Sequence, residues 1–260
     1  MRSPSAVLVA ALLTGCGLLP AAAAAGPATT AIAPATAPAG PSSRPAVVEH
    51  RVIGHSVQGR GIHAWRVGNP DARRKVVAMA AMHGDERAPR QILRSLRDGR
   101  PVTGVDLWLL PTVNPDGAAR STRKNARGVD LNRNFPHEWA ELDGITESGT
   151  GPASEPETRA LTRFLREIDP RFVVSFHQPL HGIDTHGSKQ RWFARRLVRE
   201  LELPAKEFAC GNTCHGTLTQ WFNHGFDGVS VTVEYGERPA WRRMDVHAPR
   251  QLLRAVGGSR

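Results

Sequence analysis

Metal-binding residue types occur at the ends of two short apolar segments. Residues 76–82 are followed by His83 and Glu86, and this His-x-x-Glu spacing lets an imidazole and a carboxylate share one metal ion where the chain leaves a strand. A catalytic zinc ion usually takes three protein ligands and leaves one position for water. Residues 172–177 form a second β-rich segment that ends on His177, the candidate for the third ligand.

A third segment of the same kind, residues 229–234, ends on Glu234. Three strands that end on ligand-type residues indicate one metal-hydrolase site along one edge of a sheet. In open α/β sheets, ligands collect at the carboxyl ends of the strands. His83, His177 and Glu234 all occupy such positions in the expected fold.

Strand-like and helix-like segments alternate along the chain, which predicts an α/β fold in a single domain. The expected sheet is mixed but mostly parallel, with helices on both faces. Residues 75–82 are nearly all apolar, as is typical of a strand that is buried on both faces. We expect strands over residues 47–56, 62–67, 75–82, 105–110, 172–177 and 229–234. We expect helices over residues 89–97, 191–201, 218–222 and 248–256.

Three connecting stretches have features of their own. Residues 114–117 read Asn-Pro-Asp-Gly, which is a strong turn signal. Residues 118–151 lack clear periodicity, and a loop of this length in a compact domain is usually functional. Ser154 and Glu157 have the spacing of a capping box, which predicts a helix that begins at a Ser154 N-cap and ends near residue 169.

Residues 1–25 have the features of a signal peptide, with a short positive start, an apolar centre and small residues at the end. Residues 13–16 also resemble a bacterial lipobox, in which case Cys16 would become a lipidated N-terminus. Both alternatives export the protein. We therefore expect an extracytoplasmic protein that is either secreted or lipid-anchored at the bacterial cell surface.

The leader is followed by a segment without periodicity. Residues 26–46 are rich in Ala, Pro, Thr and Ser and predict a flexible linker, so the catalytic domain is expected over residues 47–260. No later segment approaches the roughly 20 apolar residues that span a bilayer. Contact with a membrane is therefore expected only through the possible N-terminal lipid.

The chain carries a formal net charge of +10, and only four of its 34 basic residues are lysines. Arginine suits bidentate recognition of carboxylates and phosphates. An arginine-rich, solvated surface can also reflect genome composition alone. An anionic partner such as the cell wall fits the charge, whereas no basic-aromatic pattern indicates nucleic acid.

Cys210 and Cys214 remain once the leader is set aside. In an exported protein, this spacing predicts a disulfide that closes a small loop. A second metal site would need more ligands than this pair supplies.

Four sequence blocks, in order, resemble the zinc carboxypeptidase family. The His83 to Glu86 block comes first, and Glu234 closes the series. The blocks between them are residues 114–117, residues 123–125 with 128–136, which include Asp-Leu-Asn-Arg-Asn-Phe, and His177. The resemblance implies a carboxypeptidase-like fold, one bound zinc ion and hydrolysis of a peptide-type bond.

The resemblance also implies roles for individual residues. It makes His83, Glu86 and His177 the zinc ligands. It makes Glu234 the general base, which takes a proton from water and returns it to the leaving amine. Arg123 is similar to the family arginine that stabilises the developing oxyanion. Each residue also has an ordinary structural interpretation, such as a salt bridge or a solvated loop charge.

Asn132 and Arg133 are similar to the family's clamp for a free substrate carboxylate, which uses the planar guanidinium fork. Asp130 could instead hold a ligand imidazole in its metal-binding tautomer. The only tyrosine, Tyr235, directly follows Glu234. Because neighbouring side chains of a strand point to opposite faces, Tyr235 is not expected to act as the mobile tyrosine of digestive carboxypeptidases.

The short chain and residues 176–180 are most similar to the murein peptide amidase branch. Members of that branch cut the γ-D-glutamyl–diaminopimelate bond of cell-wall peptides. Asp184 is a candidate partner for the amino group of such a substrate, or alternatively caps a turn. Three alternatives stay open: a general metallocarboxypeptidase, a deacylase like the succinylglutamate desuccinylase and aspartoacylase group, and a non-catalytic cell-wall-binding protein.

Overall fold

The computed structural model describes residues 46–187, 189–208 and 211–260. All of these residues belong to one compact unit. The predicted signal peptide, Cys16 and all of the predicted linker except Ala46 lie outside the described residues. One half of the predicted disulfide, Cys210, also lies outside them, so that pairing stays a prediction.

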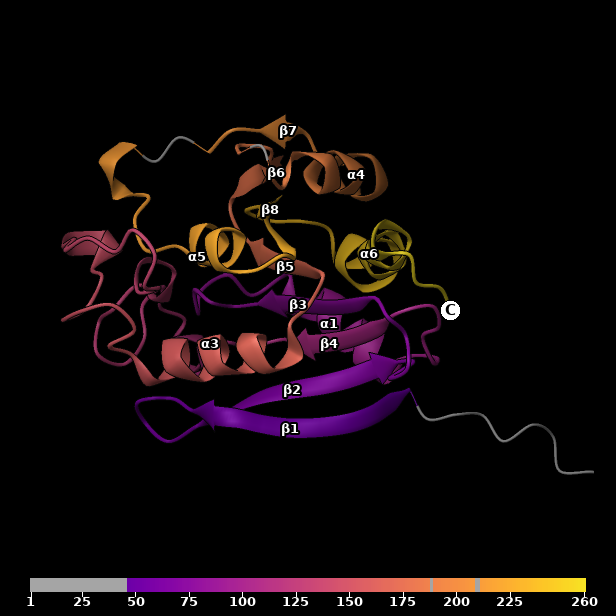
Figure 1. Cartoon of the computed structure of the whole chain (residues 1–260), viewed down its shortest axis with the longest axis horizontal. Coiled ribbons are helices and arrows are strands. Elements are labelled where there is room, and N and C mark those ends of the chain that lie inside the picture. The colour runs from indigo at the N-terminus through magenta and orange to yellow at the C-terminus, as the bar shows by residue number, and fades with distance from the viewer. Residues whose placement is uncertain (1–45, 188, 209–210) are drawn as a thin grey trace, which may run out of the picture. The chain divides into compact units, whose positions relative to one another are not determined.

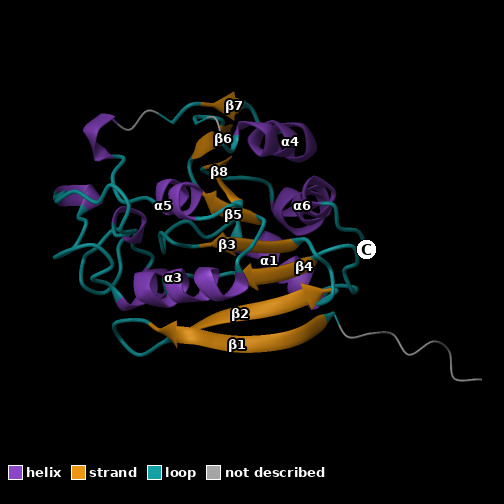
Figure 2. Ribbon diagram, viewed as in Figure 1, coloured by secondary structure: helices purple, strands orange, loops and turns teal. Residues whose placement is uncertain are grey.

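An eight-stranded mixed sheet forms the centre of the fold, with the order β1-β2-β4-β3-β5-β8-β6-β7 (Figures 1 and 2). The four central strands β4, β3, β5 and β8 are parallel to one another. The hairpin β1-β2 and strand β6 add antiparallel pairs on either side. The strands are β1 (Val47–His55), β2 (Gly61–Gly68), β3 (Lys75–Ala80), β4 (Asp106–Leu110), β5 (Phe172–His177), β6 (Leu180–Asp184), β7 (Ala205–Lys206) and β8 (Val229–Gly236).

Helices cover both faces of this sheet (Figure 1). Alternate residues of each central strand pack against different helices, and in β3 Val76 and Ala78 face one layer while Val77 and Met79 face the other. One layer contains α1 (Arg90–Asp98), α4 (Arg191–Leu201) and α6 (Ala248–Val256). The other contains α3 (Pro156–Ile168) and α5 (Leu218–Gly225). Burial on both faces explains why the central strands are apolar throughout.

The predicted α/β class is confirmed, and most predicted elements agree with the structure to within one or two residues. Two local predictions are wrong. Residues 114–117 begin the short helix α2 (Pro115–Arg120), because the Asn114 side chain caps it by accepting a hydrogen bond from the Gly117 N–H. Helix α3 begins after Glu155 with Pro156 in its first turn, so Ser154 is not its N-cap.

The long connection between α2 and α3 contains two short 3₁₀ turns, Leu131–Arg133 and Gly144–Thr146. Buried side chains hold its backbone in place. Asn134 donates to the carbonyls of Ser148 and Gly151 and accepts from the Glu155 N–H. The loop is therefore fixed by polar contacts that leave no periodic pattern in the sequence.

Two further short helical turns lie near the end of the chain. A 3₁₀ turn covers Gly211–Thr213, and a π-helical turn, Arg243–His247, leads directly into α6. Within the described ranges, no helix combines the length and the apolar character needed to cross a bilayer.

Candidate active site

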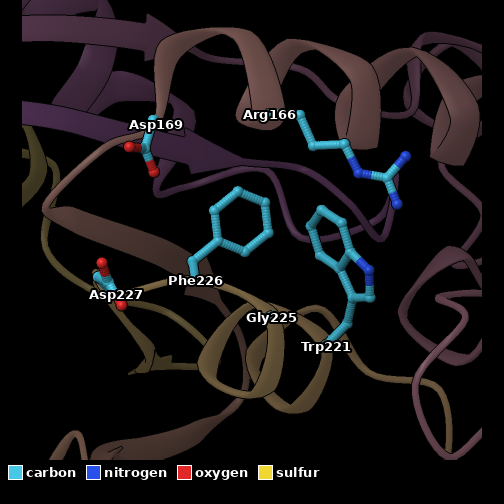
Figure 3. A pocket seen from close by; sticks show the side chains of 6 residues that line it. All are labelled: Arg166, Asp169, Trp221, Gly225, Phe226 and Asp227. Atoms are coloured by element: carbon cyan, nitrogen blue, oxygen red, sulfur yellow. The ribbon is translucent and has the colours of Figure 1, made fainter.

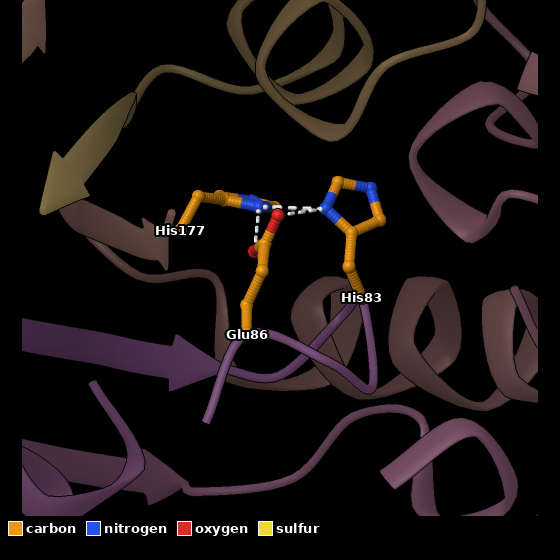
Figure 4. A group of neighbouring side chains, drawn as sticks. All are labelled: His83, Glu86 and His177. Atoms are coloured by element: carbon orange, nitrogen blue, oxygen red, sulfur yellow. Dashed lines mark hydrogen bonds and ion pairs between the residues drawn. The ribbon is translucent and has the colours of Figure 1, made fainter. Parts of the chain in front are cut away.

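The side chains of His83, Glu86 and His177 converge at the carboxyl ends of β3 and β5 (Figure 4). His83 Nδ1 lies 2.6 Å from Glu86 Oε1, and His177 Nδ1 lies 2.8 Å from Glu86 Oε2. The two Nδ1 atoms are 3.2 Å apart. Two imidazole nitrogens and a carboxylate are the His₂Glu donor set of a catalytic zinc site. The three residues fit one zinc ion, as the sequence predicted.

The backbone after β3 places His83 and Glu86 on the same side of a tight turn. The chain leaves the strand through Ala81, whose φ is 49°, and the Glu86 N–H donates to the His83 carbonyl. Gly84 packs directly on Gly117, where an added Cβ would lie 2.0 Å from the Gly117 carbonyl carbon. A side chain at residue 84 would therefore push the turn out of place.

The outward-facing nitrogen of each imidazole also has a buried partner. His83 Nε2 lies 3.0 Å from Asp130 Oδ1, and His177 Nε2 lies 2.9 Å from Ser175 Oγ. When these partners accept the Nε2 protons, each Nδ1 lone pair is free for a metal ion. The alternative in which Asp130 orients a ligand imidazole is thus the geometry found in the structure.

The site has a strongly negative potential at His83. Burial lowers the pKa of the His83 imidazole, but Glu86 and Asp130 raise it to about 9. Burial raises the pKa of Glu86, yet the two histidines lower it to about 2. The field that favours a protonated imidazole also favours a divalent cation at the same place.

Glu234 lies at the end of β8, next to His177 at the end of β5 in the parallel register. Its side chain is 7% exposed, and its Oε2 accepts a hydrogen bond of 3.2 Å from the Leu180 N–H. Burial raises the pKa of the Glu234 carboxyl, and the negative charge of Glu86 adds to this rise. A carboxylate with a raised pKa beside a metal site has the properties of a general base.

Arg123 approaches the same ligands from the long loop. Its guanidinium pairs with Asp130 through Nε at 3.1 Å and Nη2 at 2.7 Å. Its Nη1 lies 3.2 Å from His83 Nδ1 and 3.8 Å from Glu86 Oε1. Both hydrogen bonds end on the same oxygen, Asp130 Oδ2, and they fix a cation at the edge of the ligand group.

Arg133 is 8% exposed, and no carboxylate of the described residues lies within salt-bridge distance of it. Its side chain donates to the carbonyl of Asn132, and its Nε is buried without a partner in the described structure. Asn132 Oδ1 accepts from the Leu218 N–H at the start of α5. The negative charge of Asp130 acts on this guanidinium, but Asp130 itself pairs with Arg123. A buried guanidinium without a direct salt bridge among the described residues favours an additional anionic ligand.

Asp184 lies apart from the residues that converge on the metal group. Strand β6 runs antiparallel to β8, with Gly182 opposite Glu234, so Asp184 is two residues farther from the strand-end edge. Its Oδ1 accepts from the His186 N–H, as in a capped turn, and burial raises its pKa. The predicted substrate contact of Asp184 stays a prediction.

Tyr235 points into the core of the α1, α4 and α6 layer and is 1% exposed. It therefore lies on the face opposite Glu234, as the alternation of a strand requires.

Sequence reasoning missed several residues that hold the site together. Ser175 lies two residues before His177 on the same strand face, a signal that could have identified it. Asn114 Nδ2 donates to the carbonyls of Met82 and Arg123, which joins the His83 turn to the Arg123 loop. Gln178 accepts from the Ala88 N–H and donates to the carbonyl of Gly236. Asn114 and Gln178 lie in blocks that carry the family resemblance, but these contacts could not be predicted because their partners are backbone atoms of distant segments.

A separate pocket of about 380 Å³ lies between the C-terminal ends of α3 and α5 (Figure 3). These helices lead into the starts of β5 and β8, so the pocket lies at the amino edge of the sheet, away from the metal group. None of the predicted site residues lines it. Its lining residues are Arg166, Asp169, Trp221, Gly225, Phe226 and Asp227.

Comparison with known families agrees with this site. The zinc carboxypeptidase family model matches residues 41–185. The chain belongs to the zinc carboxypeptidase family, and it is a zinc-dependent hydrolase in which His83, Glu86 and His177 are grouped closely enough to hold one metal ion.

Comparison with individual relatives shows which members of the family this chain resembles. Murein peptide amidase A of Escherichia coli (strain K12) is 35% identical over 185 residues, which cover 65% of this chain and 74% of the relative. The murein peptide amidase A of Vibrio campbellii is 31% identical over 161 residues, covering 56% and 63% of the two chains. These matches confirm the predicted likeness to murein peptide amidases.

Solved structures of an amidase and of a carboxypeptidase have a similar fold. The murein-tripeptide amidase from Escherichia coli O157 superposes with a TM-score of 0.66 and 29% identity, over 80% of this chain and 90% of that one. A carboxypeptidase A from Helicoverpa armigera also has a TM-score of 0.66, over 82% and 69% of the chains. At 19% identity, that second likeness shows the fold alone.

Proposed function

We propose that this protein is an exported zinc amidase that hydrolyses the γ-D-glutamyl–diaminopimelate bond of murein peptides. The observation that carries the proposal is a buried arginine, Arg133, which forms no salt bridge with any described residue and lies in the loop that supplies Arg123 to a His₂Glu ligand group. Such a site suits an amide bond with a free carboxylate nearby. The names of the amidase relatives supply the class of peptide.

In the proposed mechanism, His83, Glu86 and His177 hold the zinc ion, with Asp130 and Ser175 orienting the two imidazoles. Bound zinc supplies Lewis-acid polarisation of the scissile carbonyl and a more acidic water. The Glu234 carboxylate takes the proton from the attacking water and then delivers it to the departing amine. The Leu180 N–H holds this carboxylate in position.

Arg123 and Arg133 have different roles in the proposed mechanism. Arg123, fixed by Asp130, donates hydrogen bonds to the oxygen that gains negative charge as water attacks. Arg133 binds the free carboxylate of the substrate, which would satisfy its buried guanidinium. The side-chain Oδ1 of Asn132 accepts a hydrogen bond from the Leu218 N–H, so Asn132 would contribute its side-chain N–H₂ group to the same carboxylate.

The experiment that tests the substrate uses the zinc-loaded protein with defined murein tripeptide and, separately, with C-terminal dipeptides. Release of diaminopimelate from the tripeptide, with little cleavage of the dipeptides, is the expected result. Efficient removal of ordinary C-terminal residues would instead identify a general metallocarboxypeptidase. Cleavage of succinyl or acetyl amino acids alone would identify a deacylase.

Export and anchoring are further parts of the proposal, which rest on the leader sequence alone. Cell fractionation of the native producer tests them, with the protein expected in an extracytoplasmic fraction. Incorporation of labelled fatty acid that is lost in a Cys16→Ser variant would identify the lipid anchor, and cleavage near residue 25 without label would identify free secretion.

A further inference from the structure

Positive charge is distributed unequally between the two helical layers of the sheet. Helices α1 and α4, together with the continuous helical segment Arg243–Val256, contain ten arginines against three acidic residues. Helices α3 and α5 on the opposite face contain three arginines against two acidic residues. An arginine bias of the genome would act on both layers, so it does not explain this difference.

Many of the arginines in the α1, α4 and α6 layer are free of acidic partners. Arg94 on α1, Arg195 on α4 and Arg250 on α6 are exposed, and within the described part of the chain no ion pair or hydrogen bond involves their side chains. Two charges within α1 repel each other: burial lowers the pKa of Arg90, and the positive charge of Arg94 lowers it further. Because α6 packs against both α1 and α4, the three helices form one continuous surface.

The same layer also presents two exposed indole rings. Trp192, the second residue of α4, is 50% exposed, and Trp241, two residues before the π-helical turn, is 68% exposed. The tryptophan of the opposite layer, Trp221 on α5, is only 6% exposed. Arginine beside exposed tryptophan is the composition of surfaces that lie in the headgroup region of a bilayer.

We propose that the outer surface of α1, α4 and α6 docks onto a bilayer rich in anionic phospholipid. Arginines of the three helices bind lipid phosphates, and Trp192 and Trp241 enter the headgroup region. The exposed indoles favour a bilayer over a soluble polyanion, which offers no apolar layer to receive them. This surface covers one face of the sheet and leaves the strand-end edge, where the metal ligands lie, open to substrate.

The test measures binding of the full chain to sedimented vesicles of phosphatidylcholine, with and without phosphatidylglycerol. Binding is expected only when the anionic lipid is present, and it should weaken as salt is raised. The triple variant Arg94→Gln, Arg195→Gln, Arg250→Gln removes one unpaired charge from each helix. Its affinity for the anionic vesicles should fall roughly a hundredfold at low salt, from the usual contribution of each surface arginine.

The matched control is the triple variant Arg159→Gln, Arg163→Gln, Arg166→Gln on α3, which removes the same net charge from the opposite face. It should bind vesicles like the parent chain. Trp241→Ala, at unchanged charge, should weaken binding to vesicles but not to soluble heparin. If the chain bound vesicles only through its apolar leader, residues 1–25, binding would persist at high salt and would be equal in every variant.

Equal losses in the two triple variants would show a general charge effect and overturn the proposal. So would salt-insensitive binding alone, or a Trp241→Ala variant that binds anionic vesicles like the parent. If the triple variant of Arg94, Arg195 and Arg250 lost heparin binding but kept vesicle binding, the ligand of this surface would be a soluble polyanion and the proposal would be wrong. None of the substituted residues belongs to the metal site, so amidase activity of each variant verifies that the chain is folded.

Discussion

Asp130→Asn tests whether the buried carboxylate behind His83 sets up the metal site. Asp130 is fully buried, and its Oδ1 accepts from His83 Nε2 at 3.0 Å and from the Asn132 N–H at 2.9 Å. Its Oδ2 receives two hydrogen bonds from Arg123. An asparagine can accept on one side only, so its amide N–H₂ must face either Arg123 or His83.

Both orientations have a cost. The ion pair with Arg123 is lost in both. If the amide N–H₂ group faces Arg123, two donor groups also oppose each other; if it faces His83, the imidazole must move its proton to Nδ1, which then cannot bind the metal. Zinc affinity should fall by about 10- to 100-fold, the usual effect of removing a group that orients a ligand. The zinc-free protein should also lose about 2 kcal/mol of stability, since hydrogen bonds to charged groups contribute roughly 1.5–3 kcal/mol and Arg123 is partly exposed.

Competition with a chelator of known affinity measures the first effect, and thermal unfolding of the zinc-free protein measures the second. A loss of about 2 kcal/mol corresponds to a fall in Tm of roughly 4–8 °C for a chain of this size. Asp85→Asn is the matched control, because Asp85 is exposed beside the same turn and forms no ion pair with any residue that the structure describes. Unchanged zinc affinity in Asp130→Asn would refute the role given to this carboxylate.

Three further variants test neighbouring parts of the structure. His177→Ala should remove the metal, and stoichiometric zinc in that variant by elemental analysis would show that the ligand set is wrong. Ser175→Ala should lower zinc affinity by about tenfold or more because it removes the acceptor for His177 Nε2, while Ser175→Thr should keep most of it. Thr217→Ala breaks the capping box of α5 and should cost about 1 kcal/mol of unfolding free energy without changing zinc affinity, as chemical denaturation can measure.

Much of the metal site could be predicted because its signals are local. The apolar strands β3 and β5 are recognisable from composition, and each is followed or ended by a histidine at the sheet edge. The spacing of His83 and Glu86 is contained in one turn. Glu234 follows from the same reasoning, since parallel neighbours bring their carboxyl ends to one edge.

The parts that could not be predicted depend on contacts between distant segments. The bond from Asp130 to His83 requires the path of the long loop, which is fixed by side chains such as Asn134 and not by periodicity. The sequence around Asn114 indicates a turn, but the residue types that start turns also occur at helix N-caps. Only the residues after Asn114 decide between a turn and a helix. Ser154 matched a capping pattern, but Pro156 starts the helix one residue later than that pattern requires.

The most direct test of the central claim is the turnover of Glu234→Gln on murein tripeptide, measured together with its zinc content. Glutamine keeps the size of the side chain but cannot take the proton from water. If Glu234 is the general base, the variant should keep a full complement of zinc and nearly unchanged substrate affinity, with a turnover lower by at least about 10²- to 10⁴-fold. A zinc-loaded Glu234→Gln protein that cleaves the tripeptide at the parent rate would contradict this role of Glu234.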